Sequence, residues 1–258
     1  MIYQNIDIKK SFQIKFRSLL DEEPILKEFL LNVFVYGTAY VVGGYFRDFL
    51  NNKESRDIDI IIDLDSVKLL DILSNMDCYY TINRHGGIKL KLQKIDVDLW
   101  SLEKNWAFKN KLVKLNENDK LNSIAKGCFF NYDSLVINLH NYTYNIRYYN
   151  DFLNARILDI LQKSSCYKNL NPTVEANIIR AFYIKETFNI NFSENITEYI
   201  VKKMESLSDK YKDGLKRIIS IKAMYPKYQE LSNDFLIDDI IRTMEHKKNL
   251  SDNLFLDF

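Results

Sequence analysis

Residues 39–63 read AYVVGGYFRDFLNNKESRDIDIIID, and this stretch decides the fold of the 258-residue sequence. An extended, β-branched run at 40–42 leads into the glycine pair 43–44, and apolar residues on one face predict a helix over 45–50. A second apolar run at 57–62 carries two aspartates. The segment therefore predicts a strand, a tight turn, a helix and a second strand in close succession.

The two aspartates of the second run, Asp57 and Asp59, are predicted to share one face of their strand, because side chains alternate between faces with period 2. Ile58, Ile60 and Ile62 then point to the other face. The apolar surroundings predict that both carboxylates are buried. Two ionised carboxylates side by side repel each other, and a folded protein tolerates them mainly when a cation lies between them. Hard oxygen ligands of this kind suit Mg²⁺.

The glycine turn before them predicts a phosphate site. Without Cβ atoms, Gly43 and Gly44 allow backbone N–H groups to approach a triphosphate closely, and the N-terminus of a helix favours negative charge. Arg47 adds a guanidinium that can bind phosphate oxygens in a bidentate manner.

Together, V-G-G-Y-F-R-D at 42–48 and R-D-I-D at 56–59 resemble the head pattern of poly(A) polymerases and tRNA CCA-adding enzymes, in the DNA polymerase β-like nucleotidyltransferase superfamily. This resemblance implies two-metal transfer of a nucleotide from an NTP, with two Mg²⁺ ions and a third carboxylate from a neighbouring strand. The strand at 94–100 offers Asp96 and Asp98, which share one face. The resemblance favours Asp98, and Asp96 stays open.

The segment 84–91, RHGGIKLK, lies just before that strand. One interpretation is a mobile loop in which Lys89 contacts phosphate or primer. The other is a plain hairpin with solvated lysines.

Composition sets broad limits. With 36 Lys plus Arg against 35 Asp plus Glu, the net charge is +1, so that any RNA binding must come from local patches.

The first 16 residues are too charged for a signal peptide, and no apolar run approaches about 20 residues, which predicts a cytoplasmic protein without a membrane span. The three cysteines, Cys78, Cys128 and Cys166, stand far apart, which argues against structural zinc and a disulfide framework.

The distribution of patterns predicts an α+β fold. Residues 1–36 are expected to form N-terminal helices that pack on the head, broken at Pro24. Residues 37–150 are expected to form a nucleotidyltransferase head with a mixed sheet and helices on one face. Its predicted strands are 40–42, 58–62, 79–82, 88–92, 95–99, 135–139 and 142–148, with a helix at 66–75. Residues 151–258 are expected to form a helical neck and C-terminal domain, with helices at 172–187, 194–205, 209–223 and 233–244, the first beginning at Pro172 with Asn171 as its cap.

The second half resembles the same family less closely. Residues 171–192 look like the neck helix, which in CCA-adding enzymes carries charged base-reading residues. The corresponding positions here are Thr173, Val174 and Asn177, which offer no charged edge for selecting CTP and ATP. The segment 127–133 likewise lacks the Arg-Asp pair of the family.

The sequence therefore predicts a Mg²⁺-dependent nucleotidyltransferase with Asp57, Asp59 and Asp98 as catalytic metal ligands. Its expected partners are an NTP and, as acceptor, an RNA or tRNA 3′ hydroxyl, without strict CCA selectivity. Three alternatives stay open: a toxin-like enzyme, a modifier of small molecules or proteins, and a non-catalytic nucleotide- or RNA-binding module.

Overall fold

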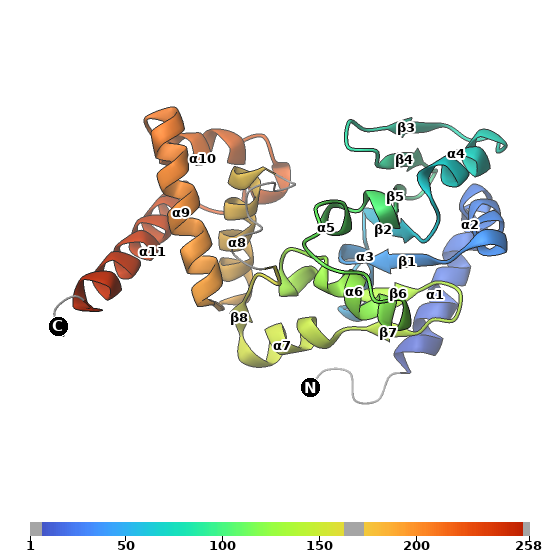
Figure 1. The fold of residues 1–258 in the computed structure, drawn as a ribbon, viewed down its shortest axis with the longest axis horizontal. Coiled ribbons are helices and arrows are strands. Elements are labelled where there is room, and N and C mark those ends of the chain that lie inside the picture. Colours follow the sequence, from blue (N-terminus) through green and yellow to red (C-terminus); the bar gives the residue numbers. More distant parts are fainter. Residues whose placement is uncertain (1–6, 163–172, 255–258) are drawn as a thin grey trace. The chain divides into compact units, whose positions relative to one another are not determined.

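The computed structural model of the protein describes residues 7–162 and 173–254 (Figure 1). The chain divides into two compact units, Met1–Asn150 and Asp151–Phe258. Among the described residues, every helix is too short or too polar to cross a membrane.

The first unit is built on a seven-stranded sheet with the order β3-β4-β5-β2-β1-β6-β7. Its central neighbours β2 and β5 run parallel, and the other neighbouring pairs are antiparallel. This mixed sheet confirms the predicted α+β fold. The strands are β1 (Ala39–Val42), β2 (Asp57–Ile62), β3 (Tyr80–Ile82), β4 (Ile88–Lys91), β5 (Asp96–Ser101), β6 (Val136–Asn138) and β7 (Tyr144–Asn145).

Two N-terminal helices precede the sheet and divide at Pro24, as predicted. Phe12 of the first helix is 1% exposed, and its ring lies 5.3 Å from that of Phe46 and 5.1 Å from that of Phe49. These aromatic contacts hold the helix that follows the glycine turn. The helices of this unit are α1 (Ile8–Glu22), α2 (Pro24–Tyr36), α3 (Gly44–Leu50), α4 (Ser66–Ser74), α5 (Trp106–Lys109) and α6 (Lys120–Lys126).

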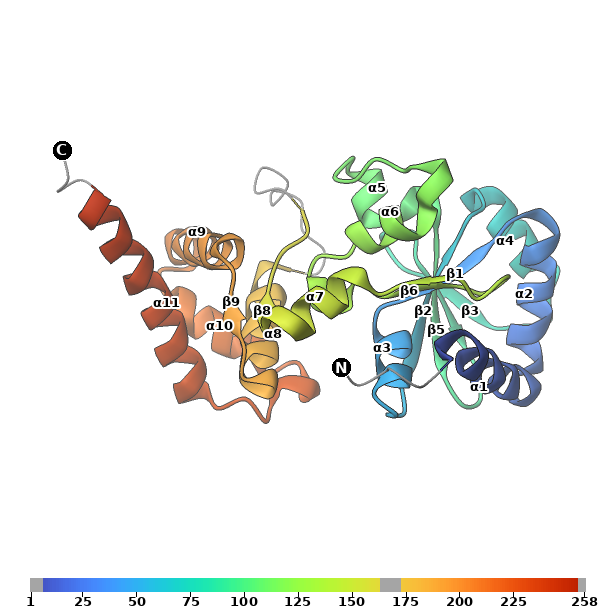
Figure 2. The same cartoon turned by 90° about the horizontal axis from the view of Figure 1, so that it is seen from below.

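Helices cover both faces of the sheet, so the expectation of one covered face was wrong. The helices α1 and α3 lie on one side of the sheet and α6 lies on the other (Figure 2). On the α6 side, Tyr40 and Ile61 pack with Ile124 and Ala125 in a buried cluster. Alternation along β1 and β2 gives both strands apolar side chains on each face, and each set needs cover.

The predicted strand at 142–148 was also too long. Only Tyr144 and Asn145 pair with β6, and a helix, α7 (Arg147–Ala155), follows at once. The side-chain oxygen of Asn145 accepts a hydrogen bond from the Arg147 N–H at 3.0 Å. This local bond favours the start of a helix over a longer strand, despite the β propensity of the tyrosines.

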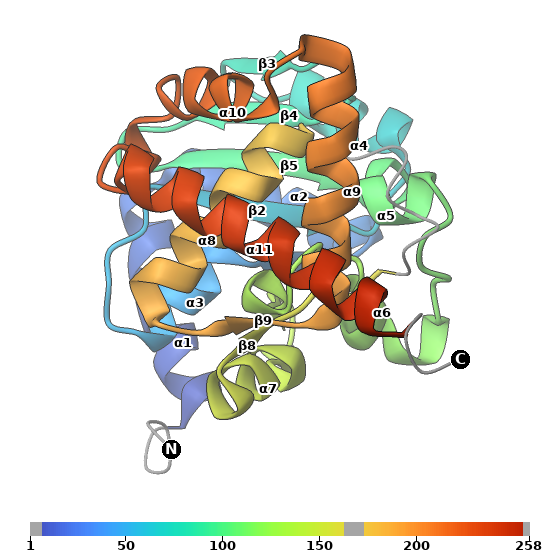
Figure 3. The ribbon, with the colours of Figure 1, turned by 90° about the vertical axis from the view of Figure 1, so that its left-hand side faces the viewer.

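The second unit is mainly helical (Figure 3). Its helices are α8 (Val174–Phe188), α9 (Glu194–Tyr211), α10 (Gly214–Lys222) and α11 (Asn233–Leu254). The two-residue strands β8 (Ile157–Leu158) and β9 (Asn191–Phe192) pair in parallel, which the sequence did not predict.

All four helices of this unit differ from the prediction in at least one boundary, and α11 continues past the predicted end at residue 244 to Leu254. The helix α9 continues to Tyr211, where Lys212 adopts a φ of 63° and Asp213 caps α10. The helix α8 begins at Val174, with Thr173 as its cap. Pro172 and Asn171 lie outside the described residues.

Candidate active site

The turn between β1 and α3 depends on Gly43. Its φ of 70° and ψ of −117° lie in a region that residues with a side chain rarely adopt. The Gly43 N–H donates a hydrogen bond to the Leu135 carbonyl at 2.8 Å. A Cβ added to Gly43 would lie 3.5 Å from the Asp133 carbonyl oxygen. Gly44 is the first residue of α3. The turn is thus tied to the segment that leads into β6.

Four carboxylates lie on one face of the two parallel strands. In the register of β2 and β5, Asp57 is the neighbour of Asp96, and Asp59 is the neighbour of Asp98. Because side chains two residues apart share a face, all four side chains leave the sheet on the same side. Val42, the last residue of β1, pairs with Asp59. The register therefore brings the acidic face next to the glycine turn.

The predicted burial of these carboxylates was wrong. Asp59 is exposed and Asp57 is half-buried, whereas Ile58 and Ile60 are 0% exposed on the opposite face. The apolar run reflects the covered face, and the face with the carboxylates is open to water at this end. Solvent access lowers the cost of keeping several like charges together, and it leaves room for a ligand.

Lys89 lies among these carboxylates. It pairs with Asp98 across the antiparallel strands β4 and β5, and its Nζ forms an ion pair with Asp96 Oδ2 at 2.9 Å. The hydrogen bond to Asp96 raises the pKa of Lys89, and the charges of Asp98, Asp96 and Asp57 raise it further, while burial opposes them. Residues 84–91 form the turn and second strand of the β3–β4 hairpin, so Lys89 projects from a regular strand. One lysine only partly neutralises four carboxylates.

The environment of Asp98 disfavours a bare negative charge. Burial is the largest cause that raises the pKa of its carboxyl, and the charges of Asp57 and Asp96 raise it further, while Lys89 lowers it. A carboxylate in such a place gains from an added cation. Asp96, in contrast, already has Lys89 as its partner. This difference favours Asp98 over Asp96 as the third ligand.

The donor chemistry of this face fits Mg²⁺, since every candidate ligand is a carboxylate oxygen. Within residues 7–162 and 173–254, no three acidic, histidine or cysteine side chains are gathered closely enough to hold a metal ion. The register places the aspartates at adjacent backbone positions of β2 and β5. That their side chains converge on a metal ion stays a prediction.

Arg47 is buried below the turn and bound by protein groups. Its side chain is 9% exposed, and an Nη donates to Asp133 Oδ1 at 2.9 Å. The second Nη lies 3.6 Å from Asp48 Oδ1, and the guanidinium stacks 4.3 Å above the Tyr132 ring. The same Nη would lie 3.8 Å from a Cβ added to Gly44. The positive charge is therefore close to the turn, although carboxylates already hold it.

The residues that support Arg47 were not predicted from the sequence. Asp133 and Tyr132 belong to the segment 127–133, which was noted only for lacking an Arg-Asp pair. The structure forms such a pair from two distant segments, Arg47 and Asp133. Ser55 was also missed, and its hydroxyl donates to Asp48 Oδ2 and to the Asp57 carbonyl at 3.1 and 3.2 Å, distances that allow it to alternate between these two acceptors. Asp133 lies just before β6 and Ser55 lies just before β2. Polar residues at the start of a strand were the sequence signal that could have identified them.

The three neck positions have structural settings of their own in the second unit. Thr173 caps α8 with its hydroxyl, which accepts from the Ala176 N–H at 3.4 Å. Asn177 is 2% exposed, and its side-chain nitrogen has no hydrogen-bond partner among the described residues. Val174 is the first residue of the helix. None of these side chains is charged.

The fold and this acidic face beside a glycine turn define a nucleotidyltransferase-type head. Residues 39–126 match the family model described as the poly A polymerase head domain. This part of the chain is therefore similar to the poly A polymerase head domain. Among curated proteins, none matches the sequence.

Solved structures with the same fold include CCA-adding enzymes. A CCA-adding enzyme with CTP is 16% identical, with a TM-score of 0.58 over 85% of this chain. The Thermotoga maritima CCA-adding enzyme complexed with tRNA is 16% identical, with a TM-score of 0.59 over 85% of this chain. A tRNA nucleotidyltransferase with a primer tRNA and an ATP analogue is 17% identical, with a TM-score of 0.57 over 84%. The chain spans only 51%, 51% and 61% of these three proteins. At this identity and coverage, the likeness establishes the fold alone.

We expect Asp98→Asn to raise the free energy of unfolding at neutral pH in the absence of divalent cations. The folded pKa of Asp98 lies above its ordinary value, and such a group contributes stability below its unfolded pKa that is lost as the pH rises through the folded pKa. The advantage of the variant should thus be smallest below about pH 4 and grow with pH. Urea unfolding across this range measures it. The exposed loop variant Asp77→Asn is the control, and an equal pH-dependent gain there would contradict the prediction.

Removing the partner of Arg47 should destabilise the head. We expect Asp133→Asn to lower the free energy of unfolding by about 1.5–3 kcal/mol, because a buried guanidinium loses its charged acceptor. Glu117→Gln removes the exposed partner of Lys120 and should cost less than about 1 kcal/mol. Thermal and urea unfolding compare the two. Equal losses would mean that the Arg47–Asp133 pair behaves as a surface ion pair.

Proposed function

We propose that this protein is a Mg²⁺-dependent nucleotidyltransferase that transfers a nucleoside monophosphate from an NTP to the 3′ hydroxyl of an RNA or tRNA. The observation that carries the proposal is the register of β2 and β5, which sets Asp57, Asp59 and Asp98 beside the Gly43 turn inside the segment that matches the head-domain family.

In this proposal Asp57, Asp59 and Asp98 hold two Mg²⁺ ions, with Asp96 as the alternative to Asp98. When bound, the ions supply positive charge at the attacking and leaving oxygens. The backbone N–H groups at Gly43 and Gly44 bind the triphosphate. Arg47 contributes its charge from below the turn, and its bonds to Asp133 and Asp48 fix its position.

Lys89 has a second proposed role at the same face. Its ammonium balances part of the carboxylate charge before metal and substrate arrive. It lies on β4, next to the strand of Asp98, and its ammonium would be able to contact a phosphate oxygen in place of Asp96 if the carboxylates held a metal ion. The lysine thus connects metal binding with substrate binding.

An RNA acceptor is supported by two of the similar solved structures, which are described as complexes with tRNA. The chain spans about half the length of the proteins it matches, so the acceptor belongs to the proposal. The cytoplasm is the compartment in which we expect such an enzyme to work.

We expect Asp57→Asn and Asp59→Asn each to reduce transfer more than about a hundredfold, because a metal-ligand loss of about 3 kcal/mol or more corresponds to that factor. The measurement is pyrophosphate release from each NTP with Mg²⁺ and total RNA. Comparing Asp98→Asn with Asp96→Asn identifies the third ligand, and Asp77→Asn is the control. Activity within about tenfold of wild type in the Asp57 or Asp59 variant would contradict the metal site.

We also expect the protein not to build the ordered C-C-A sequence. A site that selects bases must present a complementary hydrogen-bonding edge, and Thr173, Val174 and Asn177 present little of one. The experiment feeds the protein a tRNA that lacks its 3′ end, with all four NTPs, and sequences the products. One repeated nucleotide, or a mixture, is the expected result. Faithful CCA completion from CTP and ATP alone would place the base-reading residues elsewhere in the chain.

A further inference from the structure

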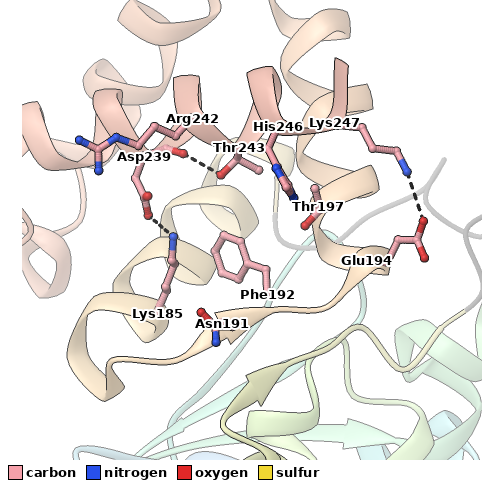
Figure 4. A pocket seen from close by; sticks show the side chains of 10 residues that line it. All are labelled: Lys185, Asn191, Phe192, Glu194, Thr197, Asp239, Arg242, Thr243, His246 and Lys247. Atoms are coloured by element: carbon pink, nitrogen blue, oxygen red, sulfur yellow. Dashed lines mark hydrogen bonds and ion pairs between the residues drawn. The ribbon is translucent and has the colours of Figure 1, made fainter. Parts of the chain in front are cut away.

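Buried carboxylates in this protein are held in two different ways. The lining of a pocket of about 540 Å³ in the second unit contains an example of the first way (Figure 4). The Asp239 side chain is only 12% exposed, and Lys185 Nζ lies 2.5 Å from its Oδ2. A nearby cation is the usual partner of a carboxylate that has been removed from water. The charge of Asp239 is therefore balanced within the second unit.

Glu23 of the first unit is held in the second way. It is 2% exposed and lies where α1 ends and α2 begins. Within residues 7–162 and 173–254 it forms no ion pair, and Lys94 directs its ammonium to the neighbouring Glu22 at 3.7 Å. The Glu23 carboxylate instead accepts hydrogen bonds from two successive backbone N–H groups, that of Gln93 at 3.4 Å and that of Lys94. Backbone dipoles therefore hold its charge, and the positive end of α2 adds to them.

The two N–H groups belong to the turn that leads into the strand of Asp96 and Asp98. Residues 92–95 connect β4 to β5, and the register of these strands pairs Lys91 with Asp96 at the base of the turn. A buried N–H group inside a turn needs an acceptor from outside the ladder of the sheet. Glu23 supplies this acceptor from a segment 70 residues away from Gln93. The side chain thereby ties the start of β5 to the junction of the two N-terminal helices.

The start of β5 is the part of that strand that carries the candidate third ligand. Asp96 is its first residue and Asp98 its third. A shift of the turn would move these two carboxylates together, relative to Asp57 and Asp59 on the neighbouring strand β2. Mg²⁺ demands near-ideal octahedral geometry, so that a small displacement of one ligand weakens the whole site. The position of the turn is therefore a requirement of the proposed metal site.

We propose that Glu23 is a positioning residue for this metal site: its carboxylate holds the 92–95 turn, and the turn sets Asp98 where it can share a metal ion with Asp57 and Asp59. The inference rests on the proposed function, since it adds a residue to that site. Glu23 acts through the backbone of the turn. A carboxylate suits this role because it accepts from both N–H groups, whereas a glutamine amide has one acceptor oxygen and places donors beside the other N–H.

The test measures the affinity of the full chain for Mn²⁺ without nucleotide, from the electron paramagnetic resonance signal of the free ion. Glu23→Gln keeps the size of the side chain and loses one acceptor, and Glu23→Asp keeps the charge and draws it back from the turn. Glu22→Gln is the charge control, because this side chain is 53% exposed and contacts Lys94 Nζ. Val33→Ala leaves a cavity at a fully buried position of α2 and controls for lost stability. Asp57→Asn identifies the part of the Mn²⁺ binding that belongs to the acidic face.

We expect the Mn²⁺ dissociation constant to rise about tenfold in Glu23→Gln, the lower end of the range for groups that orient metal ligands. It should rise in Glu23→Asp as well, and the two controls should keep the wild-type constant. Nucleotide transfer by Glu23→Gln should fall at low Mg²⁺ and return toward the wild-type rate at saturating Mg²⁺, because the variant lowers the occupancy of the site and leaves its ligands in the chain.

Wild-type Mn²⁺ affinity in both Glu23 variants would overturn the inference, as would an equal loss of affinity in either control. Failure of both Glu23 variants to fold, judged by circular dichroism, would make Glu23 a requirement of the fold and overturn its assignment to the site. The proposed function fails in a different way, since the wild-type protein would then neither bind Mn²⁺ through Asp57 nor release pyrophosphate from an NTP.

Discussion

The parallel register of β2 and β5 is the constraint on which the candidate site depends. It sets Asp57 beside Asp96 and Asp59 beside Asp98, so that four carboxylates leave the sheet on one face. Such a concentration of like charge costs free energy unless water or cations reach it. Burial is the largest cause that raises the pKa of Asp98, and the register adds the charges of Asp57 and Asp96 to it. The ion pair between Lys89 and Asp96 lies on the same face. A one-residue shift of either strand would turn its carboxylates to the opposite face, where Ile58 and Ile60 are fully buried.

The rest of the head holds these strands in place. Ile58 and Ile60 are fully buried on the opposite face, which fixes the orientation of β2. The turn at Gly43 is closed against the segment before β6, and the Arg47–Asp133 bond ties α3 to that same segment. An intact buried ion pair adds little to the free energy of unfolding, whereas the removal of one partner is strongly destabilising. The Arg47–Asp133 pair therefore acts mainly by fixing the position of the turn.

Local patterns in the sequence were sufficient for the strand, turn and helix around the glycine pair, and period 2 correctly put Asp57 and Asp59 on one face. The same period could not choose between Asp96 and Asp98, since each pairs with a carboxylate of β2. Asp133 was missed because it lies 86 residues from Arg47, and no local pattern reports such a pair. The exposure of Asp59 was missed because an apolar run does not tell which face is covered. The strand predicted at 142–148 failed where the Asn145 side chain favours a helix start over a strand.

The most direct test of the acidic face is a crystal structure of the protein with Mn²⁺ and a non-hydrolysable ATP analogue, with anomalous scattering used to locate the metal. We expect anomalous peaks bound by Asp57, Asp59 and Asp98, with the triphosphate against the Gly43 turn and Lys89 released from Asp96. Metal and triphosphate bound together with Asp57 and Asp59 outside the coordination shell would contradict the assignment of this face as the metal site.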